Sequence, residues 1–103
     1  MIRKKRNYRN FQDLLLEQLQ DPREAAAYLK AALADEDERV FLLALRDVLE
    51  ARGGNIPELA EQTQLNKQNL YRMLSKNGNP RFASLVTVLN AIGFEMTINP
   101  IKK

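Results

Sequence analysis

The stretch from Asn55 to Lys76, NIPELAEQTQLNKQNLYRMLSK, contains two short runs of apolar residues at helical spacing, separated by TQLN. Two short helices joined by a tight turn form the helix-turn-helix pattern. Asn55 is suited to cap the first helix, with Glu58 completing a capping-box-like pair, and Asn66 is suited to cap the second. This stretch constrains the fold most, because such short helices must be held by other elements of the same domain.

Residues inside the two helices and the turn match the demands of that geometry. The helices cross closely, so a small residue is needed inside the first, and Ala60 is present there. Leu65 supplies the inward apolar residue of the turn. The second helix must anchor on the core at helical spacing, which predicts burial of Leu70, Met73 and Leu74.

The opposite face of the second helix has amides and bases and no carboxylate. Amide side chains can bond the N6 and N7 edge of adenine, arginine can bond O6 and N7 of guanine, and a Tyr ring can meet a thymine methyl group. Lys and Arg are suited to phosphates, as is the amide end of the helix expected after Asn79-Pro80. An ordinary solvated helix of a bundle is the alternative, but no acid occurs from Asn66 to Phe94. The candidate DNA-binding residues are Lys67, Gln68, Asn69, Tyr71, Arg72, Ser75, Lys76, Asn79 and Arg81.

The rest of the chain also shows helical periodicity. Tyr8, Phe11, Leu15 and Leu19 predict an amphipathic first helix, and Asp21 can cap a second that carries Pro22 in its first turn. A third helix over residues 39–52 is apolar nearly all round, which is typical of a central buried element. A further helix is expected from residues 79–80 to 93. These segments predict an all-α protein.

Residues 94–99 change to a period of two. Phe94, Met96 and Ile98 alternate with polar residues before Pro100, which predicts a short strand. A lone strand has unpaired backbone groups, and the same strand of a second copy would pair them in a two-fold dimer. The alternative is a C-terminal tail packed on the helices.

With 103 residues, the chain has the length of one domain. We expect residues 1–38 to form a basic tail and a two-helix extension. Residues 39–103 are expected to form a helix-turn-helix DNA-binding domain with the C-terminal strand. The predicted fold is all-α and phage-repressor-like, with about five helices and a strand that pairs across a dimer.

Cysteine and histidine are both absent. Their absence excludes disulfides, thiolate metal sites and histidine-activated nucleophiles, so we expect no catalytic residues, metal or cofactor. The acidic run Asp35–Glu38 lacks the glycine and ligand spacing of a calcium loop and instead complements the dipole of a helix start. No run is long enough to span a membrane, and the N-terminus lacks the apolar stretch of a secretory signal, so a cytoplasmic protein is expected.

Charge is unevenly distributed along the chain, although the net charge is only +3. Residues 1–10 carry five bases and no acid, residues 67–103 carry six bases and one acid, and residues 35–50 are acidic. Two basic ends predict a polyanionic partner. The N-terminal bases are either a DNA arm lying in a groove or a disordered solubilising tail.

Three runs, ALRDVLEARGGN, LAEQTQLNKQNLYRMLSKNGNP and LVTVLNAIGF, together with YLKAAL near Tyr28, carry a resemblance that covers most of the chain. They resemble the probable addiction-module antidote proteins, HigA-like members of the phage-repressor-type helix-turn-helix group. This resemblance implies a cytoplasmic repressor that binds its own operator and a small RelE/ParE-type toxin. It places the family's recognition-helix positions on Lys67, Gln68, Asn69 and Arg72. One departure is Gln64, at a turn position that is often glycine. If this position needs positive φ, glutamine costs about 1 kcal/mol there and glycine does not.

The leading functional hypothesis is a dimeric, sequence-specific repressor that binds a palindromic operator in double-stranded DNA and acts as the antitoxin of a type II toxin–antitoxin module. One alternative is a stand-alone phage-type regulator without a toxin. Another is a protein-interaction module that does not bind DNA. No enzymatic activity and no membrane association are expected.

Overall fold

The computed structural model describes residues 10–75 and 77–102. This part of the chain is all-α, as predicted, and contains no strand. Six helices form where about five were expected, one for each segment with helical periodicity. The elements are α1 (Phe11–Gln18), α2 (Pro22–Leu33), α3 (Glu38–Ala51), α4 (Ile56–Thr63), α5 (Lys67–Met73) and α6 (Phe82–Ala91).

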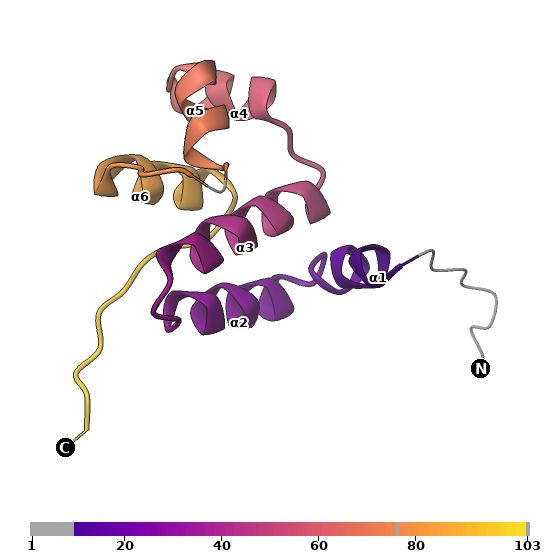
Figure 1. Cartoon of the computed structure of the whole chain (residues 1–103), viewed down its shortest axis with the longest axis vertical. Coiled ribbons are helices and arrows are strands. Elements are labelled where there is room, and N and C mark those ends of the chain that lie inside the picture. The colour runs from indigo at the N-terminus through magenta and orange to yellow at the C-terminus, as the bar shows by residue number, and fades with distance from the viewer. Residues whose placement is uncertain (1–9, 76, 103) are drawn as a thin grey trace.

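The helices are arranged around α3 (Figure 1). α2 runs back along α3, α1 packs against the same central helix, and α6 lies on the side of α3 away from α2. α4 and α5 form a pair above α6, at the end of the molecule opposite α1 and α2. This arrangement leaves the outer side of the α4–α5 pair facing away from the rest of the protein.

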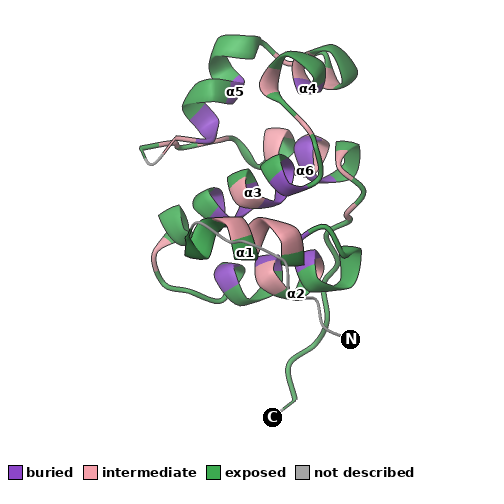
Figure 2. Cartoon of the chain, turned by 90° about the vertical axis from the view of Figure 1, so that its right-hand side faces the viewer, coloured by how far each residue is buried: buried purple, intermediate pink, exposed green. Residues whose placement is uncertain are grey.

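The centre of the core is α3, as its sequence predicts. Its buried side chains include Phe41, Leu45 and Val48, and Leu45 and Val48 are 0% exposed. Figure 2 shows α3 with buried positions between the α1–α2 layer and α6. Leu19, the C-cap of α1, and Leu29 of α2 join the same continuous cluster. The functional division between residues 1–38 and 39–103 stays a prediction.

The acidic run before α3 acts as a helix start. The backbone N–H of Arg39 donates to Asp37 Oδ1 at 3.0 Å, so Asp37 is the N-cap of α3, and the N–H of Asp37 donates to Asp35 Oδ1 at 2.8 Å. The guanidinium of Arg39 also pairs with Asp37 at 2.8 Å. The hydrogen bonds that Arg39 donates, that of its guanidinium first and that of its backbone N–H second, lower the pKa of the Asp37 carboxyl. The run thus caps the helix, and the described residues contain no group of three or more acidic side chains arranged to hold a metal ion.

Side-chain hydrogen bonds to Asp47, the polar joint, connect the first three helices. The hydroxyl of Tyr28 on α2 donates to Asp47 Oδ2 on α3 at 2.8 Å, and the amide of Gln12 on α1 donates to Asp47 Oδ1 at 3.1 Å. Burial first, and then the hydrogen bond to Asp47 and its negative charge, raise the pKa of Tyr28 to about 12.

We expect Tyr28 to titrate late in the folded protein. Its pKa is raised above the ordinary value of 10.0, so the stability that it contributes is present below pH 10 and is lost as the pH rises towards 12. The difference in tyrosinate absorbance between wild type and Tyr28→Phe should show a midpoint of about 12. Asp47→Asn should move this midpoint down. A Tyr28 midpoint near 10 in the folded protein would contradict the joint.

The C-terminal segment after α6 has no regular secondary structure over residues 94–102. Phe94 packs against the core, with the guanidinium of Arg52 at 5.5 Å from its ring centroid. Met96, Thr97 and Asn99 also line a hollow of about 200 Å³ with residues of α2, although Ile98 and Ile101 are 96% and 78% exposed. The end of the segment points away from the helices (Figure 1). The alternative of a tail packed on the helices fits Phe94 and the residues that line this hollow. The strand stays a prediction, because its pairing needs a second copy.

Two helix boundaries differ from the sequence predictions. α5 ends at Met73, earlier than the predicted end near Lys76, which lies outside the described residues. α6 begins at Phe82, after the predicted start at residues 79–80. The reason is a tight loop, in which the N–H of Gly78 donates to the carbonyl of Ser75 at 3.0 Å. A Cβ on Gly78 would lie 2.3 Å from the carbonyl oxygen of Met73, so only glycine fits here.

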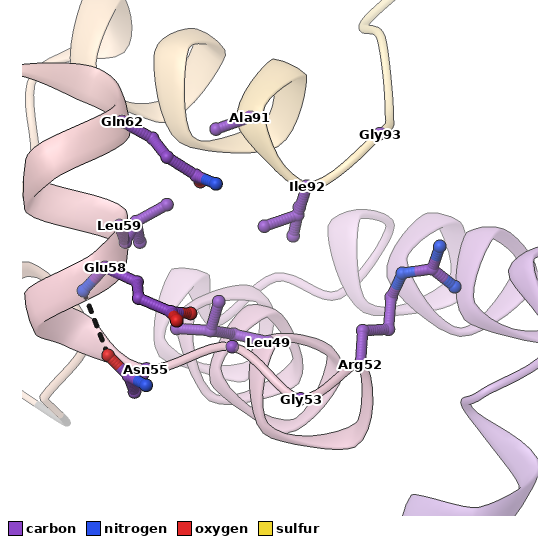
Figure 3. Close-up of a pocket in the computed structure, with 11 residues that line it drawn as sticks. Leu49, Arg52, Gly53, Asn55, Glu58, Leu59, Gln62, Ala91, Ile92 and Gly93 are labelled. Atoms are coloured by element: carbon purple, nitrogen blue, oxygen red, sulfur yellow. Dashed lines mark hydrogen bonds between the residues drawn. The ribbon is translucent and has the colours of Figure 1, made fainter.

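The seam between α3, α4 and α6 is shown in Figure 3. Leu59 from α4 and Ile92 from the end of α6 face each other across a hollow of about 360 Å³, while Leu49 of α3 lies below them. The α3–α4 connection passes close to Leu49. A Cβ on Gly54 in this connection would lie only 2.6 Å from the Leu49 side chain. Leu59 is 2% exposed, so its burial beside α6 holds α4, and α5 packs on α4 in turn. Over the described ranges, no helix is long and apolar enough to cross a membrane.

Candidate nucleic-acid interface

The α4–α5 pair is anchored as its sequence predicts. Leu70 is 0% exposed, Met73 5% and Leu74 4%, so all three predicted anchors of α5 are buried. Ala60 and Leu65 are partly buried and pack against the same core. Because one side of α5 is held in this way, its opposite side is turned outward, and Figure 2 shows exposed positions over its outer turns.

Hydrogen bonds within the chain fix the turn between α4 and α5. The hydroxyl of Thr63 donates to the carbonyl of Leu59 at 2.7 Å and accepts from the N–H of Leu65 at 3.2 Å. Asn66 then caps α5 by accepting from the N–H of Asn69 at 3.1 Å. Gln64 lies between Thr63 and Leu65 with φ 65° and ψ 17°. This is the left-handed conformation, which explains why glycine is favoured at this position.

Replacing Gln64 with glycine is expected to raise the free energy of unfolding by about 0.5–1 kcal/mol. Glycine adopts positive φ without the steric cost of a Cβ, and this gain exceeds the extra backbone entropy that it loses on folding. The exposed hydrogen bond from the Gln64 amide to the Glu61 carbonyl is also lost, at small cost. Urea unfolding measures the change. Gln64→Val should lower the free energy of unfolding, and equal stability of the two variants would contradict this prediction.

The predicted contact residues on α5 are turned outward. Lys67, Gln68, Asn69 and Arg72 are all exposed, and Tyr71 is 55% exposed. None of the acids of the chain lies on α5, in the turn before it or in the loop after it. The outer side of α5 is therefore a cationic and amide-rich surface.

Four of the predicted contact residues line one hollow beside α5, the cationic hollow. This hollow, of about 490 Å³, lies between α5, the following loop and the start of α6. Its polar lining contains no carboxylate, and neither arginine in it forms an ion pair with any described residue. The polar residues are Asn69 and Arg72 from α5, Asn79 and Arg81 from the loop, and Ser84 from α6.

Tyr71 and Ser75 lie elsewhere. They line a second hollow of about 480 Å³, together with Arg46 and Glu50 of α3. The Ser75 hydroxyl donates to the carbonyl of Arg72 at 2.7 Å, so its proton is already used within the chain. The structure thus separates these two from the cationic hollow, and Lys76 lies outside the described residues.

Ser84 was missed by the sequence analysis. It lies three residues after Arg81 in the first turn of α6, and this spacing places both on one side of a helix start. That signal could have been found, but only with the correct start of α6. The sequence analysis placed the start of this helix at residues 79–80 and gave Ser84 no role.

The family model described as "Probable addiction module antidote protein" matches residues 9–100, which is most of the chain. The chain belongs to this family. The resemblance found in the sequence is thereby confirmed, and an antidote implies a toxin as its partner.

The antidote protein also has a relative in Haemophilus influenzae, described as an uncharacterized protein. The two are 30% identical over 82 residues, which cover 80% of this chain and 82% of the relative. No solved structure matches the chain.

Proposed function

We propose that this antidote protein is a sequence-specific DNA-binding repressor that acts as the antitoxin of a type II toxin–antitoxin module. The observation that carries the proposal is the acid-free outer side of α5, continued by the cationic hollow beside it. A surface with amides, arginines and no carboxylate complements the base edges and phosphates of a duplex.

In this proposal α4, the Gln64 turn and α5 form a helix-turn-helix, with α5 as the recognition helix in the major groove. Gln68, Asn69 and Arg72 read base edges, because they are exposed on the outer side of α5. Lys67 at the start of α5 and Arg81 in the loop bind phosphates on either side. Asn79 assists Arg81, whereas Tyr71 and Ser75 contribute at the margin.

The repressor binds as a homodimer to a palindromic operator. Two recognition helices about 34 Å apart enter successive major grooves, and the bound dimer blocks the promoter. The C-terminal strand over residues 94–99 pairs across this dimer in the same proposal. The toxin partner is a small RelE/ParE-type protein encoded beside the antidote, and both act in the cytoplasm.

Binding to DNA from upstream of the protein's own gene tests this function. Fluorescence anisotropy should show specific binding whose affinity falls log-linearly with salt, because phosphate contacts release counterions. A scrambled duplex should bind more weakly. The absence of any DNA binding at about 50 mM salt would reject the repressor and favor a protein-interaction module.

Co-expression with the neighboring reading frame tests the toxin partner separately. A stable complex with a small toxin that this protein neutralises would support the antitoxin role. Operator binding without any toxin partner would instead identify a stand-alone regulator. The family match favors the first outcome.

A further inference from the structure

The polar side chains that line the cationic hollow are not used within the protein. None of the five forms a side-chain hydrogen bond or an ion pair with any described residue. The five are Asn69 and Arg72 of α5, Asn79 and Arg81 of the loop, and Ser84 of α6. Two guanidinium groups and further donors that meet in one hollow without a carboxylate favor an anionic ligand with several oxygen atoms.

Ser84 differs from other hydroxyl residues nearby. A serine or threonine hydroxyl in or beside a helix commonly donates to a carbonyl three or four residues before it. Thr87 of α6 donates in this way to the carbonyl of Ala83 at 2.9 Å. Ser75, after α5, donates to the carbonyl of Arg72 at 2.7 Å. The Ser84 hydroxyl donates to no described residue and lines the cationic hollow, so its proton is available to a ligand.

The remaining lining of the hollow is apolar and consists of Leu65, Leu70, Met73 and Pro80. Leu70 and Met73 are 0% and 5% exposed, so this part of the wall belongs to the core. Apolar walls reduce the access of water to a bound anion, which strengthens the hydrogen bonds that the anion accepts. A sugar–phosphate unit has both an anionic and an apolar part and therefore matches this lining.

We propose that the cationic hollow binds one phosphate group and that Ser84 is its hydroxyl donor. Arg81 and Ser84 are three residues apart at the start of α6, a spacing that lets both side chains reach the same phosphate. Arg81 supplies the positive charge, and Ser84 supplies a neutral hydrogen bond. A phosphate held here also fixes how α5, which forms the other wall and carries Arg72, lies against the bases.

The inference rests on the proposed function for the source of this phosphate, which is the backbone of the operator DNA. Because α5 forms one wall of the hollow, a duplex that contacts the outer side of α5 brings its own backbone to the hollow. Free phosphate is a second source of the same chemistry. The test therefore has one arm with DNA and one arm without it.

Removing the hydroxyl tests the contact with DNA. Ser84→Ala should weaken operator binding about threefold to tenfold in fluorescence anisotropy, because one hydrogen bond to a charged oxygen is lost. The loss should be equal for every base substitution in the operator. The slope of log affinity against log salt should not change, because a neutral hydroxyl displaces no counterion. An unchanged slope distinguishes this loss from that of a charged contact.

Two further variants control for structural effects. Ser84→Thr keeps a hydroxyl at this position and should restore most of the operator affinity. Thr87→Val is the matched control, because it removes an α6 hydroxyl that already donates to the carbonyl of Ala83. It should bind the operator as wild type does. An equal loss of affinity in Thr87→Val and Ser84→Ala would overturn the role of Ser84.

Operators in which single phosphates are replaced by neutral methylphosphonates locate the contact. Wild type and Ser84→Ala should differ least in affinity when the replaced phosphate is the one that occupies the hollow, because the contact is then lost in both. A difference that is the same at every replaced phosphate would overturn the assignment to one phosphate.

A titration with inorganic phosphate tests the hollow without DNA. The backbone amide NMR signals of Arg81 and Ser84 should shift saturably with phosphate. Sodium chloride at equal ionic strength should not reproduce the shifts, and Arg81→Ala should abolish them, because the guanidinium supplies the charge at this site.

The outcomes separate this inference from the proposed function. Unchanged operator affinity in Ser84→Ala would overturn the DNA contact and leave the repressor proposal intact, and saturable shifts would then identify free phosphate as the source. Saturable shifts in a protein that binds no DNA would support the phosphate site and reject the repressor. Unchanged affinity in Ser84→Ala together with no saturable shift would overturn the phosphate site altogether.

Discussion

Replacing Arg72 with alanine is expected to weaken operator binding by about 1–3 kcal/mol and to relax the preference at one base position. Arg72 is exposed on the outer side of α5 and forms no ion pair with any described residue, so its guanidinium is available for a guanine edge. The loss should therefore be large for the preferred base and small for the others. Anisotropy against operators substituted at each position measures both effects.

Two further arginine substitutions sharpen this test. Arg81→Ala should weaken binding nearly equally for all sequences and reduce the salt slope by about one, as expected of a phosphate contact. Arg23→Ala removes an exposed arginine from α2, far from α5, and should leave binding unchanged. Equal loss on every sequence for Arg72→Ala would contradict its role in base reading.

Leu70→Ala is expected to cost about 2–5 kcal/mol of folding free energy, a large share of the roughly 5–15 kcal/mol that stabilises a domain of this kind. Leu70 is 0% exposed and lies in the middle of α5. A helix this short does not form alone, so its position depends on the buried anchors. Urea unfolding should show the loss, and operator binding should fall as α5 loses its fixed orientation.

The matched control is Leu33→Ala, which makes the same substitution at a residue of α2 that is 56% exposed. Its effect on the free energy of unfolding should be small, because little apolar area is removed from the interior. Similar losses for Leu33→Ala and Leu70→Ala would show that Leu70 does not anchor α5. Retained operator binding in folded Leu70→Ala would mean that α5 is oriented by its other contacts.

Much of the geometry of the candidate interface could be predicted because it is local. Leu70, Met73 and Leu74 repeat at helical spacing, so their burial implies which side of α5 faces outward. Asn55 and Asn66 mark the starts of α4 and α5 because an Asn oxygen can accept from a backbone N–H three residues later. Such signals depend only on neighbors in sequence.

Loops and helix faces were harder to predict. The Gly78 loop ends α5 early and delays α6, and it thereby brings Asn79 and Arg81 beside Arg72 while Ser75 turns elsewhere. Positive φ at Gln64 was anticipated only from a family position, because glutamine itself gives no such signal. The packing of α6 depends on distant segments, which bury Val88 and Leu89 and leave Phe82 69% exposed.

By itself, the amino-acid sequence determined the helical segments, their caps and an outward row of bases and amides on α5, because helix periodicity and capping act over a few residues. Only the tertiary structure decided which predicted residues share one hollow and which side of α6 remains uncovered. Those outcomes depend on how distant segments pack on α3 and on the path of the loop before α6, and spacing along the chain does not encode either.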